Sequence, residues 1–184
     1  MTQAVQANAK PILQQIVEQC RAEPLVFDDV SPDLCPALEQ IILDRMLHAR
    51  GRKTGSLNIG GWKSGEDFFS WRDSAVQELR QAIVDLLGAL SPVAWAMVNR
   101  AGSQHPRHQH RIAVLSGIYY VTRGSEDAIT PTIFECPCAA NQRYDLEIEP
   151  DPGRLVLCQG QMWHRVPRYA GEAPRITIAF DIRR

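Results

Sequence analysis

The chain lacks long apolar runs, an excess of one charge and a signal-like start. No stretch of about 18 apolar residues occurs, which predicts that no helix spans a membrane. Its 20 Lys and Arg residues balance 21 Asp and Glu residues, and the net charge is −1, so the overall charge does not favour a nucleic-acid or anionic-membrane partner. The polar stretch from Met1 to Lys10 lacks the basic start and apolar centre of a secretory signal.

The sequence also lacks a cysteine framework. Its five cysteines are odd in number and scattered, which is typical of a reduced, intracellular protein, and we expect a cytoplasmic location. Cys136 and Cys138 are separated by one residue rather than the two of the usual zinc or redox spacing. We interpret this pair as structural.

Internal repeats and low-complexity linkers are absent too. With 184 residues, of which 45% are hydrophobic, the chain is long enough for one domain with a sizeable core. We expect a single domain over 1–184, with mainly helical support over 1–90 and a β-rich part over 91–184. Oligomeric state is not readable from the sequence, and a symmetric homodimer is the base-rate expectation.

Apolar residues recur at helical spacing in three stretches of the first half. The spacing predicts helices over residues 11–20, 31–51 and 75–88, with a short strand over 24–29. In the second helix, Ser31 is suited to the N-cap, Pro32 to the first turn and Gly51 to the end.

From residue 92 onward, short apolar or alternating runs are separated by turn residues. They predict strands over Ala94–Asn99, Ala113–Val121, Thr132–Cys136, Tyr144–Glu149, Arg154–Cys158, Met162–Val166 and Arg175–Ile182. This pattern is typical of a β-sandwich or small barrel, with the helices covering one face, and it argues against alternating βαβ units.

Four of the five histidines lie in the β-rich half. On an extended strand, His108 and His110 would point to the same face, so that both imidazoles could bind one metal with His164 as the third ligand. Iron(II) oxygenases need three facial protein ligands, usually two histidines and a carboxylate, while three histidines also suit zinc. The competing interpretation is a polar loop without metal. His48 falls in a predicted helix and is interpreted as solvated or capping.

The predicted strand that begins at Arg175 carries a second signal. Alternation places Arg175, Thr177 and Ala179 on one face and Ile176, Ile178 and Phe180 on the other. A guanidinium and a hydroxyl on one face suit a carboxylate ligand. From this strand alone, a surface arginine paired with Glu172 or Asp181 is the better interpretation. Similarly, Tyr120 could direct its hydroxyl inward toward a bound acid or could serve packing.

Taken together, these elements resemble a family of 2-oxoglutarate- and iron(II)-dependent oxygenases, small bacterial and phage proteins. The resemblance spans roughly residues 25–182. It is carried by the following motifs: Gly60-Gly-Trp-Lys-Ser64, Trp95-Ala-Met-Val-Asn99, His108-Gln-His110, Ser116-Gly-Ile-Tyr-Tyr120, and the stretch from Pro150 through His164 to Phe180. Two departures stand out: Cys158–Met162 replaces a stretch that contains Phe-Pro, and Asp181 follows Phe180 where asparagine is usual.

The resemblance implies a mainly β fold, a double-stranded β-helix (jelly roll), with Fe(II) and the cosubstrates 2-oxoglutarate and dioxygen. Carried over residue by residue, it implies His108, His110 and His164 as metal ligands and Arg175 as the partner of the distal carboxylate of 2-oxoglutarate. It assigns Asn99, Tyr120 and Thr177 to the lining of the cosubstrate pocket.

Several alternatives stay open from the sequence. His105 could replace His110 as a ligand, or only two histidines could bind. The chain could be a cupin-like three-histidine enzyme that does not use 2-oxoglutarate, or a non-catalytic β-sandwich binding module. The primary substrate is not readable; Trp62, Trp71 and Trp163 suit either a substrate mouth or the core.

Overall fold

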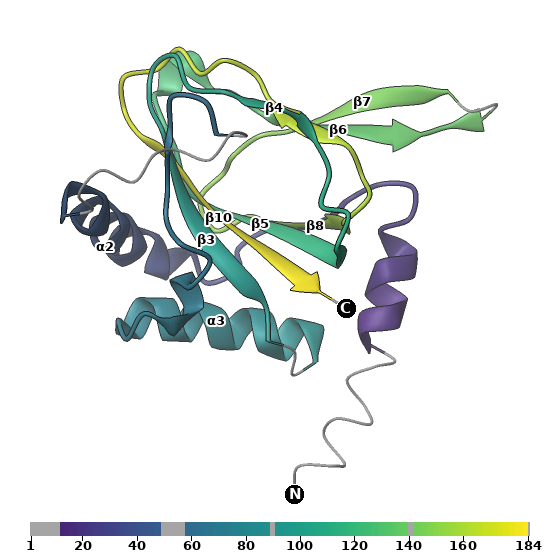
Figure 1. Cartoon of the computed structure of the whole chain (residues 1–184), viewed down its shortest axis with the longest axis horizontal. Coiled ribbons are helices and arrows are strands. Elements are labelled where there is room, and N and C mark those ends of the chain that lie inside the picture. The colour runs from purple at the N-terminus through teal and green to yellow at the C-terminus, as the bar shows by residue number, and fades with distance from the viewer. Residues whose placement is uncertain (1–11, 49–57, 89–90, 140–141, 184) are drawn as a thin grey trace, which may run out of the picture.

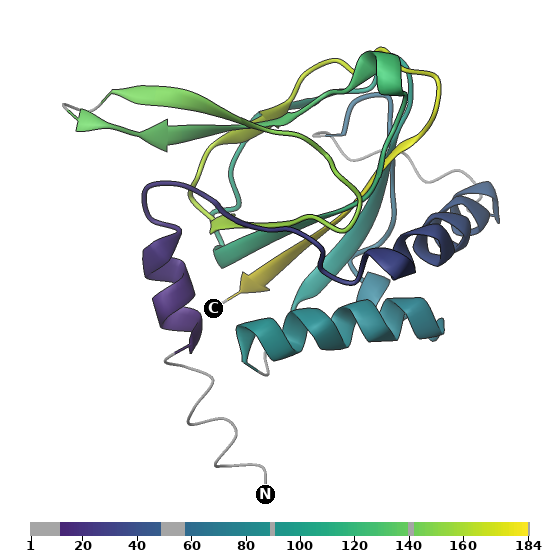
Figure 2. The same cartoon turned by 180° about the vertical axis from the view of Figure 1, so that it is seen from behind.

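Two antiparallel sheets face each other, and helices cover the outer face of the larger one (Figure 1). This computed structural model describes residues 12–48, 58–88, 91–139 and 142–183. Figure 2 shows the same layers from behind, with α2 (Cys35–His48) and α3 (Ser74–Leu87) below the larger sheet. Among the described residues, no helix is long and apolar enough to cross a membrane.

The larger sheet has six strands in the order β1-β8-β5-β10-β3-β2. Their bounds are β1 (Leu25–Phe27), β8 (Leu155–Gln159), β5 (Ala113–Arg123), β10 (Arg175–Arg183), β3 (Val93–Asn99) and β2 (Trp62–Lys63). The smaller sheet has four strands in the order β4-β9-β6-β7. Their bounds are β4 (His105–His108), β9 (His164–Val166), β6 (Thr132–Pro137) and β7 (Arg143–Ile148). The mainly β architecture predicted from the sequence is confirmed.

All seven strands predicted after residue 92 are present, with bounds shifted by a few residues at most. The strand that the prediction missed is β4. Its sequence His-Pro-Arg-His has no apolar alternation, so nothing local distinguishes it from a polar loop. Two short strands of the first half, β1 and β2, form the edges of the larger sheet.

The predicted helices also form, with one correction. A helix covers residues 12–19, and α3 ends at Gly88, whose φ of 77° is the left-handed conformation that favours glycine. Ser31 does not cap its helix through its side chain: it is itself left-handed (φ 48°), and the short 3-10 helix η1 (Pro32–Leu34) precedes α2. Gly51, the predicted end of this helix, lies outside the described residues. Two further 3-10 turns are η2 (Phe68–Ser70) and η3 (Glu126–Ala128).

Strand β10 separates the core from the interior between the sheets. Ile176, Ile178 and Phe180 pack into the hydrophobic core against the helices, as the alternation predicted. Arg175, Thr177 and Ala179 line a cavity on the opposite face of the same strand. Because β10 pairs with β5 on one side and β3 on the other, its residues are held rigidly at the centre of the sheet.

Candidate metal centre and ligand pocket

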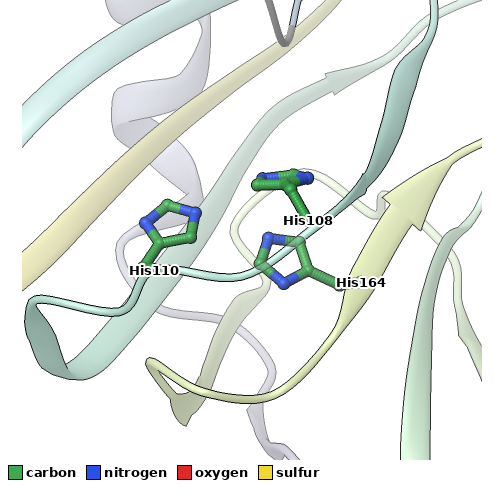
Figure 3. A group of neighbouring side chains, drawn as sticks. All are labelled: His108, His110 and His164. Carbon is green, nitrogen blue, oxygen red and sulfur yellow. The ribbon is translucent and has the colours of Figure 1, made fainter.

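Three histidines from two strands and a loop meet at one point between the sheets. His108 ends β4 and His164 begins β9, and the two residues are direct partners in the antiparallel pairing. Their ring centroids lie 4.2 Å apart, and the ring of His110 lies 5.3 Å from each of them. One possible ligand atom from each of the three residues lies within 4.8 Å of those of the other two (Figure 3). The predicted convergence of His108, His110 and His164 is therefore present in the fold.

The hydrogen bonds of the three rings leave the same nitrogen free on each. Nδ1 of His108 lies 2.8 Å from the carbonyl oxygen of Pro106, and Nδ1 of His164 lies 3.1 Å from that of Met162. Nδ1 of His110 lies 2.7 Å from Oδ1 of Asp181. Carbonyl and carboxylate oxygens only accept, so each Nδ1 carries a proton and Nε2 is the atom left to bind a metal. Three imidazoles that offer Nε2 atoms fit a divalent transition metal.

Burial favours the neutral form of two of these rings, those of His108 and His164. It lowers the pKa of His108 and, more strongly, that of His164, because a charged imidazolium loses hydration inside the protein. Neighbouring His105 shows the same effect, and its pKa is lowered to about 3, first by burial and then by repulsion from the other histidines and nearby cations. His108 and His164 therefore present lone pairs rather than positive charges at neutral pH.

His110 reaches the cluster by a route other than the predicted one. Strand β4 ends at His108, so His110 does not lie on an extended strand beside it. Instead, its backbone N–H donates to the carbonyl of Gly160 (2.6 Å), and its carbonyl accepts from the N–H of Ala113 (3.0 Å). Its ring stacks on Trp95 with centroids 5.8 Å apart and planes 12° apart. A tight turn, rather than strand alternation, aims this imidazole.

Arg175 is the second notable element of the same cavity. It is 2% exposed, so the interpretation as a surface arginine paired with Glu172 or Asp181 is wrong. Its Nε donates to the carbonyl of Thr130 (3.1 Å) and its Nη2 to the hydroxyl of Thr132 (3.1 Å). Burial lowers its pKa, and no carboxylate among the described residues forms an ion pair with it. A buried cation without a counter-charge is costly, and it points to an anionic ligand.

The other predicted pocket residues have different outcomes. Thr177 lines the cavity, is 1% exposed, and its Oγ1 has no hydrogen-bond partner among the described residues. Asn99 also lines the cavity and donates through its amide to Oδ1 of Asn58 (3.3 Å). Tyr120 is not among the residues that line it; its hydroxyl donates to Thr132 (2.8 Å), and its ring centroid lies 5.6 Å from the Arg175 guanidinium. Tyr120 therefore contacts the arginine and its threonine partner.

A wider pocket of about 470 Å³ opens beside the histidines. Three of its lining residues are Lys63, Trp95 and Asp181, and it shares His105, His108 and His110 with the inner cavity. Nζ of Lys63 lies 4.3 Å from the centroid of the Trp95 ring, and burial lowers the pKa of this lysine. The volume is within the range of small-molecule sites.

Sequence reasoning missed several residues of this region. Thr132 and Trp95 lie within predicted strands, and nothing in the local sequence marks them as site residues. Lys63 lies on a two-residue strand that no pattern predicts. Asp181 was considered as a partner of Arg175 and as a departure from the usual asparagine, but not as a neighbour of His110. The three tryptophans considered for a substrate mouth do not line the inner cavity or the wider pocket. His48 lies apart on α2, exposed, with Nδ1 2.6 Å from the carbonyl of Asp44.

Comparisons with known proteins agree with this geometry. Residues 93–181, from β3 to β10, match the family described as "Putative 2OG-Fe(II) oxygenase". No curated protein matches the chain. Among solved structures, a prolyl-4-hydroxylase from Pseudomonas putida is 17% identical, with a TM-score of 0.68 over 94% of this chain and 98% of that one.

Two further structures share the fold. A prolyl hydroxylase from Trichoplax adhaerens, in complex with a peptide fragment of the hypoxia inducible factor oxygen degradation domain, is 15% identical, with a TM-score of 0.69 over 99% of this chain and 94% of that one. A viral collagen prolyl hydroxylase from Paramecium Bursaria Chlorella virus-1, in complex with 2-oxoglutarate, is 11% identical, with a TM-score of 0.64 over 89% and 98%. At these identities the likeness shows the fold, the double-stranded β-helix.

Proposed function

We propose that this chain, whose residues 93–181 match a family of 2-oxoglutarate- and Fe(II)-dependent oxygenases, is a dioxygenase of the hydroxylase type whose iron is held by His108, His110 and His164. The observation that carries the proposal is a single cavity that contains both the three imidazoles and the buried, uncompensated guanidinium of Arg175. A metal site alone would explain the histidines but not the cation.

The histidines contribute geometry and neutral donors. Their Nδ1 atoms are held by Pro106, Met162 and Asp181, so the Nε2 atoms are the ones left to bind a metal ion. Iron(II) at this point, with 2-oxoglutarate and dioxygen, supplies the oxidative chemistry of the reaction. The chain keeps that chemistry away from bulk water, since His108 and His164 are only 8% and 6% exposed.

Arg175 and Thr177 are proposed to bind the distal carboxylate of 2-oxoglutarate. The guanidinium is already oriented by Thr130 and Thr132, so it loses little conformational freedom on binding. The hydroxyl of Thr177, buried without a partner in the described structure, gains one in the complex. Asn99 completes the lining of the cavity from β3.

The primary substrate is proposed to occupy the wider pocket beside the histidines. This pocket reaches the same three residues, His105, His108 and His110, that line the inner cavity. A substrate there would lie next to the metal without displacing 2-oxoglutarate. Its mixed lining of Lys63, Glu66, Trp95 and Arg111 favours a polar organic molecule.

Two other functions remain as outcomes of the test. A three-histidine enzyme that does not use 2-oxoglutarate has no need of Arg175. A non-catalytic binding module has no need of the three aimed Nε2 atoms.

The experiment is an anaerobic titration of the metal-free protein with Fe(II), followed by 2-oxoglutarate. We expect a weak visible charge-transfer band when 2-oxoglutarate joins the iron, and we expect the band to be lost in Arg175→Ala while iron still binds. Arg123→Ala is the matched control, because Arg123 is the cross-strand partner of Arg175 on β5 but pairs with Asp151 and Glu126 outside the cavity. Iron binding without a charge-transfer band on addition of 2-oxoglutarate would support the three-histidine alternative, and failure to bind iron would support the binding module.

A further inference from the structure

The carboxylate of Asp181 lies directly behind one of the three histidines. Asp181 is 3% exposed on β10. Its Oδ1 accepts hydrogen bonds from Nδ1 of His110 and from Oγ of Ser116, each at 2.7 Å. The side chain therefore faces the interior between the sheets rather than solvent.

This contact distinguishes His110 from its two neighbours. The Nδ1 atoms of His108 and His164 donate to neutral backbone carbonyls, whereas that of His110 donates to a carboxylate. All 21 Asp and Glu side chains of the sequence lie within the described residues. Among these, Asp181 is the one whose carboxylate lies within hydrogen-bonding distance of a histidine ring.

The contact between His110 and Asp181 places a negative charge close to a proposed ligand set that has none of its own. The usual facial set of an iron(II) oxygenase contains one carboxylate, whereas the proposed set here contains three neutral imidazoles. Such a set lacks one negative charge beside the cation. A carboxylate hydrogen-bonded to the far nitrogen of a ligating histidine makes that imidazole a stronger donor and fixes its tautomer and orientation.

We propose that Asp181 is a positioning residue of the metal centre, which supplies through Nδ1–H of His110 the negative charge that the ligand set itself lacks. This inference rests on the proposed function, since it takes His110 as a metal ligand. Asp181 acts on the metal through His110 and does not itself touch the ion.

The fold holds the carboxylate in place. Asp181 is the cross-strand partner of Ser116 on β5, the residue whose hydroxyl donates to Oδ1. Oδ2 lies 3.9 Å from Nη2 of Arg183, which is engaged more closely by Glu66 at 2.8 Å. The indole ring of Trp95 stacks on a face of the His110 ring. The imidazole is thus held by the indole on its face and by the carboxylate of Asp181 at its edge.

The decisive variant is Asp181→Asn, which keeps the shape and an accepting oxygen but removes the charge. We expect its affinity for Fe(II), or for Co(II) as an air-stable probe, to fall by about 10- to 100-fold, the usual effect of losing such a partner. We also expect the Fe(III)/Fe(II) midpoint potential to rise, because removing a nearby negative charge disfavours the more highly charged ion. A purely structural role of Asp181 would not move this potential in a folded protein.

Two matched variants test the specificity of the effect. Glu66→Gln removes a carboxylate that lines the same pocket but pairs with Arg183 rather than with a histidine. Ser116→Ala removes the other hydrogen bond to Oδ1 while the charge and the contact with His110 remain. Both should change metal affinity and potential far less than Asp181→Asn does. Thermal unfolding of the metal-free proteins checks that every variant is folded.

The outcomes separate the two levels of the proposal. If the wild-type protein binds Co(II), and Asp181→Asn has the same metal affinity and the same midpoint potential, the role of Asp181 is overturned and the proposed function stays intact. Absence of Fe(II) and Co(II) binding by the wild-type protein would overturn both. An equal loss in Glu66→Gln would also overturn the specific role, since general pocket charge would then suffice.

Discussion

Nη2 of Arg175 donates a hydrogen bond to the hydroxyl of Thr132, 3.1 Å away, and that hydroxyl in turn accepts one from the hydroxyl of Tyr120 at 2.8 Å. The three residues come from β10, β6 and β5, so the guanidinium is held between the two sheets. This arrangement fixes the direction of the cation but does not neutralise it. The guanidinium therefore remains a buried positive charge without a counter-charge among the described residues.

Replacing Arg175 with Met should abolish binding of 2-oxoglutarate without destabilising the metal-free protein. Removal of a buried charge that has no counter-ion, in favour of an apolar side chain of similar length, is expected to be neutral or stabilising. Calorimetric titration with 2-oxoglutarate and thermal unfolding measure the two effects. A marked fall in Tm would instead assign Arg175 a mainly structural role.

Thr177→Val should weaken 2-oxoglutarate binding while leaving the empty protein at least as stable. The hydroxyl of Thr177 is buried without a partner among the described residues, so its removal costs nothing before the ligand binds. Loss of one hydrogen bond to a charged group, worth about 1.5–3 kcal/mol, corresponds to roughly a 10- to 150-fold weaker Kd. Thr122→Val is the control: that hydroxyl donates to the carbonyl of Pro174 and accepts from Ile176 N–H, so its loss should lower Tm and spare binding.

The choice between His105 and His110 as a ligand can be settled by two glutamine variants. His110→Gln should lose metal affinity by at least roughly tenfold, because His110 belongs to the group whose ligand atoms converge. His105→Gln should retain it, since His105 packs against His108 with ring centroids 4.7 Å apart but lies outside that group. Co(II) titration of both variants measures the difference, and the reverse ranking would reassign the site.

Glu135 should make the stability of the protein depend on pH. Three arginines surround it: Nη2 of Arg107 donates to it at 2.7 Å, and Arg165 and Arg143 lie within 3.7 and 3.9 Å. The hydrogen bond from Arg107 is the main cause that lowers the pKa of Glu135 below its ordinary 4.5. A lowered folded pKa means that the stabilisation is fully present above about pH 4.5 and is lost as the pH falls through the folded value.

The corresponding variant is Glu135→Gln. It should lower Tm by a few degrees at pH 7, and the difference from the wild type should shrink on acidification below the ordinary pKa of a glutamate. High salt should shrink the difference as well, because the arginine partners are exposed. A difference in Tm that is constant with pH would show that charge is not its origin.

Gly117→Ala should destabilise the fold by about 1–3 kcal/mol through overpacking. Gly117 faces Phe180 across the β5–β10 pair, and a Cβ at this position would overlap the phenyl ring. Chemical denaturation measures the loss. The double variant Gly117→Ala with Phe180→Leu should recover part of it, whereas no recovery would indicate a backbone effect of the glycine itself.

Much of the fold follows from local patterns. The alternation in β10 correctly separated Arg175 and Thr177 from Ile176 and Ile178, because side chains two residues apart share a face whatever the topology. The apolar spacing of α3 likewise located a helix that packs on the core. These features depend on near neighbours in the chain.

Local patterns did not predict how the side chains of the candidate site are oriented. The pair His108 and His110 was selected for strand alternation, yet His110 follows the strand and is aimed by Gly160 and Ala113. The two rings do lie close together, but a turn after the strand brings His110 there rather than strand alternation. The resemblance assigned Tyr120 to the pocket lining, whereas in the structure its hydroxyl donates to Thr132 and its ring faces Arg175, both of which line the cavity.

By itself, the sequence determined which residues share a face of a strand or helix, since that depends only on the period of the backbone. Only the tertiary structure brings the ring of His164, 54 residues further along the chain, next to that of His110. It also places Asp181 at the edge of the His110 ring. It also decided that Arg175 is buried without a counter-charge. These relationships arise from long-range pairing between strands, whose register is set by the packing of the whole sheet rather than by any short stretch of chain.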